Sequence, residues 1–172
     1  MITTSSSEFA EKIKMLRNHG MRDKYHHEMV GINSRLDEIQ AAVILVKLKW
    51  IDRWNNLRLK IAQVYTEGLE GLPLQTPTHP AHSKPTHHLY SILTDKRDDL
   101  HRFLTARGIG SGIYYPLPLH LQPCYTVLGC MTGDFPVSER VAKRILSLPM
   151  YPELSRKAVT NVISEIRVFY GD

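Results

Sequence analysis

Few of the features that mark a disulfide-rich or membrane-bound protein occur in this sequence of 172 residues. It contains two cysteines, Cys124 and Cys130, and a chain of this size does not need a disulfide to be stable, so we expect both thiols to be reduced. No apolar run approaches the roughly 18 residues that cross a bilayer. The first residues lack the basic and apolar regions of a signal peptide. These absences predict no membrane partner and a cytoplasmic location.

Motifs that carry well-understood chemistry are missing as well. The sequence has no glycine-rich dinucleotide or P-loop pattern, no GxSxG nucleophile and no HExxH pair. The nine histidines are not spaced as metal ligands, because the adjacent pairs His26–His27 and His87–His88 would point to opposite faces of a strand. We therefore predict no metal site, and spacing alone identifies no catalytic residue.

The charge is basic overall, with a formal net charge of +5. Lysine and arginine are scattered among aspartate and glutamate, and no basic run or aromatic-interleaved patch occurs. This pattern is typical of a solvated surface, so we predict no nucleic-acid partner. Phosphorylated small molecules remain compatible with it.

The longest periodic segment, residues 34–69, predicts one long helix. Ser34 and Asp37 have the spacing of a capping box, and no proline or glycine interrupts the pattern before Gly68. Apolar residues recur in helical steps at Leu36, Ile39, Val43, Val46, Trp50, Trp54, Leu57, Ile61 and Val64. A second apolar set in the first half (Ala42, Ile44, Leu48 and Ile51) predicts burial on two sides, against the helix's own domain and a second surface. Gly31 and Asn33 precede this helix, where its N-terminus could present N–H groups to an anion.

The remaining elements predict an α+β domain with a small sheet covered by helices. The expected helices cover Ser7–Leu16, Asp98–Arg107, Gln122–Leu128, a segment opened by Pro136, and a last segment capped by Ser155; the expected strands cover His88–Leu93 and Ile109–Tyr115. Tyr114, Tyr115 and His120 surround a proline-rich turn. They could line a pocket, although a packed aromatic corner explains the same residues and is favoured by the residues alone.

Several segments together resemble one protein family. They are LRNHG at 16–20, GINSRLDEIQAA at 31–42, HLY at 88–90, RD at 97–98, YPLPLH at 115–120, FPVSE at 135–139 and LPMYP at 148–152. In this order and spacing they are similar to the C-terminal part of the DegT/DnrJ/EryC1/StrS aminotransferases, which depend on pyridoxal 5'-phosphate and mostly aminate nucleotide-linked keto-sugars.

The resemblance implies the small C-terminal domain of the aspartate-aminotransferase fold. Residues 1–33 would be the end of the large domain and a linker, residues 34–70 the long helix, and residues 71–172 the small domain. Asn33 would reach the cofactor phosphate in a neighbouring subunit, which predicts a homodimer or partner subunit through the Ser34–Leu69 helix. His88, Tyr115 and His120 would lie near the substrate, a nucleotide-sugar that reacts with an amino donor.

One departure from the family limits what this chain is expected to do. The family's Schiff-base lysine lies in a segment resembling SFxxxKxLGxxGDGG, upstream of Met1, and no lysine here stands in that context. Transamination needs that amine. We therefore expect no catalytic residue and an inactive chain when it is alone. The alternative is a non-catalytic dimerisation or interaction module derived from the family.

Overall fold

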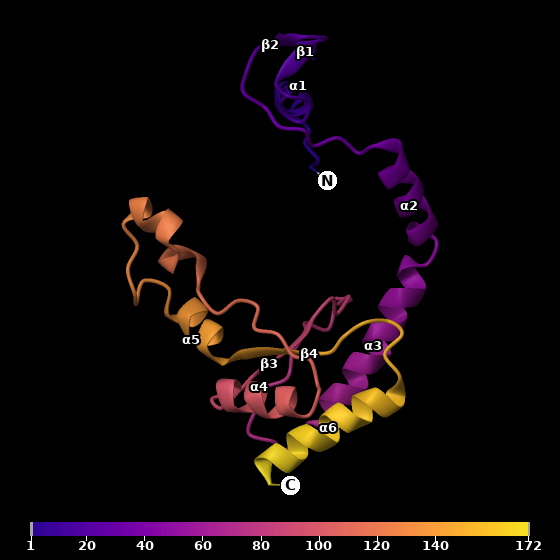
Figure 1. The fold of residues 1–172 in the computed structure, drawn as a ribbon, viewed down its shortest axis with the longest axis vertical. Helices are drawn as coiled ribbons and strands as arrows, with labels where there is room; N and C mark the ends of the chain where they lie inside the picture. Colours follow the sequence, from indigo (N-terminus) through magenta and orange to yellow (C-terminus); the bar gives the residue numbers. More distant parts are fainter. Residues whose placement is uncertain (1, 172) are drawn as a thin grey trace. The chain divides into compact units, whose positions relative to one another are not determined.

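The computed structural model describes residues 2–171, which form two compact units that adjoin in the sequence between Trp50 and Ile51. Figure 1 gives the order of the elements along the chain. Among the described residues, no helix combines the length and the apolar composition that a membrane crossing requires.

The first unit contains two helices and a short hairpin. Helix α1 covers Ser7–Leu16, as predicted, and its N-cap is Ser6, whose hydroxyl accepts the N–H of Phe9. Strands β1 (Met21–Asp23) and β2 (His26–His27) pair antiparallel, in a segment for which no strand was predicted. Helix α2 covers Glu38–Leu48, and none of its residues is buried.

The single helix predicted for residues 34–69 is wrong. Helix α2 ends before Lys49, the N–H of Trp50 bonds to the carbonyl of Lys47 in a turn, and α3 begins separately as Ile51–Gly68. The apolar pattern also changes here, since α2 is mostly apolar and buries none of its residues, whereas α3 buries one face through Ile61, Ala62 and Tyr65. Neither glycine nor proline marks this point, so the sequence contains no local signal for it.

The second unit is built on a two-stranded sheet. Strand β3 (Tyr90–Leu93) pairs antiparallel with β4 (Ile145–Leu148), with Tyr90 opposite Leu148. Single bridges extend the sheet at both edges, from Gln75 to Leu93 and from Gly112 to Ser147. The predicted strand at Ile109–Tyr115 is therefore reduced to one paired residue, whereas β4 forms in a segment for which no strand was predicted.

Helices and 3₁₀ turns surround this sheet. They are α4 (Arg97–Ala106), the 3₁₀ helices η1 (Leu119–Leu121) and η2 (Pro123–Leu128), α5 (Pro136–Arg144) and α6 (Arg156–Tyr170). Ser155 caps α6 as predicted, by accepting the N–H of Ala158. Helices α3 and α4 both contact α6. The architecture is α+β, as expected.

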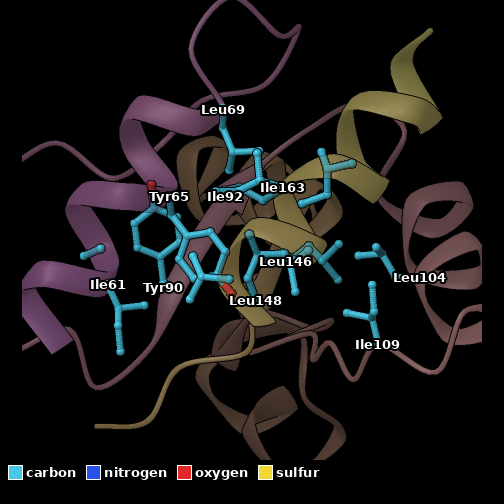
Figure 2. Packing of buried hydrophobic residues seen from close by; sticks show 14 of the residues in the cluster. Ile61, Tyr65, Leu69, Tyr90, Ile92, Leu104, Ile109, Leu146, Leu148 and Ile163 are labelled. Atoms are coloured by element: carbon cyan, nitrogen blue, oxygen red, sulfur yellow. The ribbon is translucent and has the colours of Figure 1, made fainter. Parts of the chain in front are cut away.

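Figure 2 shows the core of the second unit, to which α3, both strands, α4 and α6 contribute. The rings of Tyr65 and Tyr90 stack with their centroids 5.0 Å apart. Both hydroxyls are paired, since Tyr65 donates to the carbonyl of Pro149 and Tyr90 contacts the hydroxyl of Thr66. Two large polar rings are thus buried without an unsatisfied oxygen.

One isoleucine and one valine on α6, Ile166 and Val168, test this core. Ile166 is fully buried, whereas Val168 is 55% exposed on the same helix. Ile166→Ala should lower the free energy of unfolding by about 2–5 kcal/mol, because it removes buried methyl groups and leaves a cavity. Val168→Ala should change it by less than about 0.5 kcal/mol. Urea unfolding followed by circular dichroism measures both, and equal losses would contradict the assignment of the core.

Candidate functional site

The second unit contains a cavity of about 820 Å³ between the segment that follows Tyr114 and helix α5. Its lining is mostly apolar and includes Tyr115, Leu119, Tyr125, Phe135 and Val141. The polar side chains among the lining residues are those of His120, Gln122, Ser138 and the tyrosines. A concave, largely apolar surface with a few polar groups is the usual form of a small-molecule site.

Two of the residues expected near the substrate come together here. Tyr115 and His120 line the same cavity, and Tyr115 is 74% exposed, which leaves its hydroxyl and ring available to a ligand. The ring of Tyr115 does contact that of Tyr114 edge-on, with 5.9 Å between centroids, but it is exposed and not buried in a packed corner.

His88 is not among the residues that line the cavity. It is exposed and lies in the turn before β3, because that strand begins at Tyr90 instead of His88. The neighbouring His87 is the one that packs inward, with its ring 5.0 Å from that of His79 and 6.2 Å from that of Tyr90.

Glu139 is the residue of this site for which the sequence suggested no role. Its Oε1 accepts the N–H of Gly133 at 2.8 Å and that of Phe135 at 3.4 Å, and lies 3.0 Å from Nε2 of His120. The ring of His120 packs on that of Phe135, with 4.7 Å between centroids. Pro136 did indicate a helix start. The partnership with His120 has no local signal.

The hydrogen bonds to Glu139 stabilise its charged form. The N–H of Gly133 is the largest influence that holds the pKa of this carboxyl below its ordinary value, and the bond from His120 acts in the same direction. Burial acts against them. An ionised carboxylate, only 9% exposed, therefore lies behind His120, which lines the cavity.

Asn33 belongs to the first unit. Its backbone forms a bridge with Asn18, and main-chain bonds on both sides (Ile32 to Leu16 and Ser34 to Arg17) fix the segment. The side-chain Oδ1 of Asn33 accepts Nε–H of Arg35 at 3.2 Å. Its amide N–H groups therefore face away from that bond and have no partner among residues 2–171.

Two glycines permit this arrangement. A Cβ on Gly31 would lie 2.2 Å from the nitrogen of Gly20, and a Cβ on Gly20 would lie 1.7 Å from the carbonyl oxygen of Met29. Gly20 also has φ of +76°, which favours glycine. The segments 16–20 and 31–33 can therefore pair only because each contributes a glycine.

The expectation of an anion site on N–H groups of a helix beginning at Ser34 is wrong. Helix α2 begins at Glu38, and its capping box consists of Asp37 and Gln40, with the Asp37 N–H bonded to the Gln40 side chain at 3.2 Å. Asn33 lies before this terminus. Any contact of Asn33 with an anion thus depends on its side chain and not on helix N–H groups.

Comparison with known proteins places this chain among aminotransferases. The family model for the DegT/DnrJ/EryC1/StrS aminotransferase family matches residues 1–167. A pleiotropic regulatory protein of Geobacillus stearothermophilus is 45% identical over 99% of this chain and 46% of its own length. The dTDP-3-amino-3,4,6-trideoxy-alpha-D-glucose transaminase of Streptomyces venezuelae is 42% identical, over 96% of this chain and 44% of its own.

Solved structures agree with the sequence relatives. The crystal structure of S. venezuelae DesV superposes with a TM-score of 0.88 at 42% identity, covering 99% of this chain and 46% of that one. An aminotransferase from Brucella abortus gives a TM-score of 0.86 at 40% identity, covering 98% and 45%. The chain spans about half the length of the curated relatives it matches.

The lowered pKa of Glu139 makes a prediction about acid stability. Its pKa is lower in the folded chain than the ordinary glutamate value of 4.5, so its charged form stabilises the fold above that pH, and the contribution is lost as the pH falls through the folded pKa. Glu139→Gln should therefore lower stability at pH 7 and leave a smaller further loss between about pH 5 and pH 3. Urea unfolding at several pH values measures this, and parallel acid losses in both proteins would contradict it.

Proposed function

This chain belongs to the DegT/DnrJ/EryC1/StrS aminotransferase family, and we propose that it supplies the C-terminal part of a pyridoxal 5'-phosphate-dependent enzyme that aminates nucleotide-linked keto-sugars. The observation that carries the proposal is the match to the family over residues 1–167. The S. venezuelae relative is named for a dTDP-linked aminosugar, and one from Acidithiobacillus ferrooxidans, 39% identical, for a UDP-linked one. Nucleotide-sugars are thus the proposed substrate class.

The cavity of the second unit is the proposed wall of the substrate site. Tyr115 offers an exposed ring and hydroxyl, and His120 offers an imidazole held by Glu139. Apolar surface with a few oriented polar groups suits a sugar or a base, each of which has flat apolar faces and hydrogen-bonding edges. His88 is exposed and lies outside the cavity, so we do not propose it as part of this wall.

Asn33 is the proposed contact of this chain with the cofactor phosphate in a neighbouring subunit. Among residues 2–171 its amide N–H groups have no partner, and neither they nor the adjacent guanidinium of Arg35 bond to a carboxylate; donors of this kind fit one edge of a phosphate. When bound, pyridoxal phosphate would supply the electron sink of the reaction. The residues of this chain would bind and orient it, and none of them is proposed as catalytic.

Helix α2 is the proposed contact surface for a partner subunit. Its apolar side chains are exposed, among them Ile39, Val43, Leu45 and Val46, each between 49% and 82%. An exposed apolar surface of this kind marks an interaction site. We also propose a division into domains. Residues 1–33 would be the end of the large domain and a linker, residues 34–70 would connect the two domains, and residues 71–172 would form the small domain.

Titration with a nucleotide-sugar tests the substrate proposal. Adding dTDP-glucose to the isotope-labelled chain should shift the NMR signals of Tyr115 and His120 and leave His88 unchanged, because only the first two line the cavity. Adding pyridoxal phosphate should shift the NMR signals of the Asn33 side-chain amide and of the backbone in residues 31–35. In Asn33→Ala the backbone signals of this segment should no longer shift. Shifts confined to other surfaces with either compound would refute the corresponding half of the proposal.

The exposed helix α2 favours a second candidate, a non-catalytic dimerisation module. A specific interface needs roughly 800 Å² per partner. Sedimentation should show a concentration-dependent dimer that Val46→Glu disrupts, while Gln63→Glu on the exposed side of α3 does not. A dimer that binds neither dTDP-glucose nor pyridoxal phosphate would favour this candidate. A monomer at high micromolar concentration would refute the proposed interface.

A further inference from the structure

The bond between Glu139 and His120 determines where the imidazole carries its proton. A carboxylate accepts hydrogen bonds and does not donate them when ionised. Since Oε1 of Glu139 lies 3.0 Å from Nε2 of His120, Nε2 must carry the hydrogen. In the neutral ring the other nitrogen, Nδ1, then has a free lone pair and is a hydrogen-bond acceptor.

Glu139 is itself held in place. The N–H groups of Gly133 and Phe135 both bond to the oxygen that faces His120, and the residue is 9% exposed. These bonds also favour its charged form, because they hold the pKa of the carboxyl low. The Phe135 ring against His120 restricts the imidazole plane. Neither partner can turn away without breaking several contacts.

Nδ1 of His120 is the ring nitrogen for which the described residues supply no hydrogen-bond partner. His120 lines the cavity, and among the described residues no hydrogen bond involves its Nδ1. The side chain of His120 is 9% exposed, so a ligand would reach it from the cavity side. The imidazole thus presents an acceptor to whatever occupies the cavity.

We propose that Glu139 is a positioning residue that fixes His120 as the Nε2–H tautomer, so that Nδ1 accepts a hydrogen bond from a hydroxyl or N–H group of the ligand. The inference rests on the proposed function, because it takes the cavity as the substrate site. A lone pair at this position matches a sugar hydroxyl or a base N–H, and disfavours a phosphate oxygen there.

The tautomer can be read directly from the two ring ¹⁵N shifts of His120 at about pH 8, where an ordinary imidazole is neutral. We expect a protonated Nε2 and an unprotonated Nδ1. His27 is an internal reference of the opposite kind, because its Nδ1 lies 2.9 Å from the carbonyl oxygen of His19 and must donate to it. The two histidines should therefore show reversed patterns in one spectrum.

Three variants separate positioning from a general effect on the fold. Glu139→Ala removes the acceptor and should give a mixture of tautomers. Glu139→Gln keeps an acceptor oxygen and should restore the Nε2–H form. Arg140→Ala changes the next, exposed residue and should leave His120 as in the unchanged chain. Amide signals of β3 and β4 report in each case whether the sheet is intact.

Titrations with two ligands identify the ligand group that donates a hydrogen bond to Nδ1. Adding dTDP-glucose should move the Nδ1 shift upfield as it accepts a hydrogen bond, and dTDP, which lacks the sugar, distinguishes a sugar hydroxyl from a base N–H. Glu139→Ala should weaken binding of dTDP-glucose about five- to tenfold, the worth of one hydrogen bond, and Glu139→Gln by no more than about twofold.

The possible results distinguish a failure of the inference from a failure of the proposed substrate site. A protonated Nδ1 in the unchanged chain, or the same tautomer in Glu139→Ala, overturns the inference and leaves the proposed function standing. Cavity shifts with dTDP-glucose that spare Nδ1 also overturn only the inference. If the tautomer follows Glu139 but neither nucleotide shifts any cavity residue, the cavity fails as a substrate site, and the ligand part of the inference fails with it.

Discussion

The pairing of β3 with β4 is the constraint on which the second unit depends. Four residues of each strand are paired, and the inward side chains of Ile92 and Leu146 are fully buried between the helices. On its other edge β4 bonds to Gly112, from which the chain continues to Tyr115. Helix α5 runs directly into β4 without a connecting loop, because α5 ends at Arg144 and the strand begins at the next residue. Both walls of the cavity are therefore attached to one short strand.

Within that frame a single carboxylate organises the polar part of the site. Glu139 lies in the first turn of α5, where backbone N–H groups lack helical partners and the helix dipole favours negative charge. Its oxygen satisfies the N–H of Gly133 and that of Phe135 and also binds His120. The Glu139 carboxylate thus stabilises the start of α5 and also orients the imidazole of His120, which lines a mostly apolar cavity wall. The N–H groups of Gly133 and Phe135 need an acceptor, and the residue that supplies it also determines how His120 faces a ligand.

Much of the fold could be predicted from the sequence, where the signal is local. Periodicity and capping residues located α1 and α6 closely, because a cap and an amphipathic face are properties of neighbouring residues. The elements missed are those that contacts decide. Strand β4 is a short buried run that reads as the end of a helix, and residues 109–115 have the composition of a strand but pair only at Gly112. The interruption between α2 and α3 has no residue to mark it.

The sequence by itself determined the family, through motifs spread over most of the chain, and it identified Tyr115, His120 and Asn33 as residues of interest. Only the tertiary structure decided how they are held. His120 meets Glu139 across 19 positions of sequence, and His88 lies outside the cavity, before a strand β3 that begins two residues later than predicted. Asn33 is fixed by pairing with Asn18, made possible by the close approach of Gly20 and Gly31, instead of by a helix terminus. The physical reason is that helical propensity acts between neighbours, whereas these contacts depend on how separate segments pack.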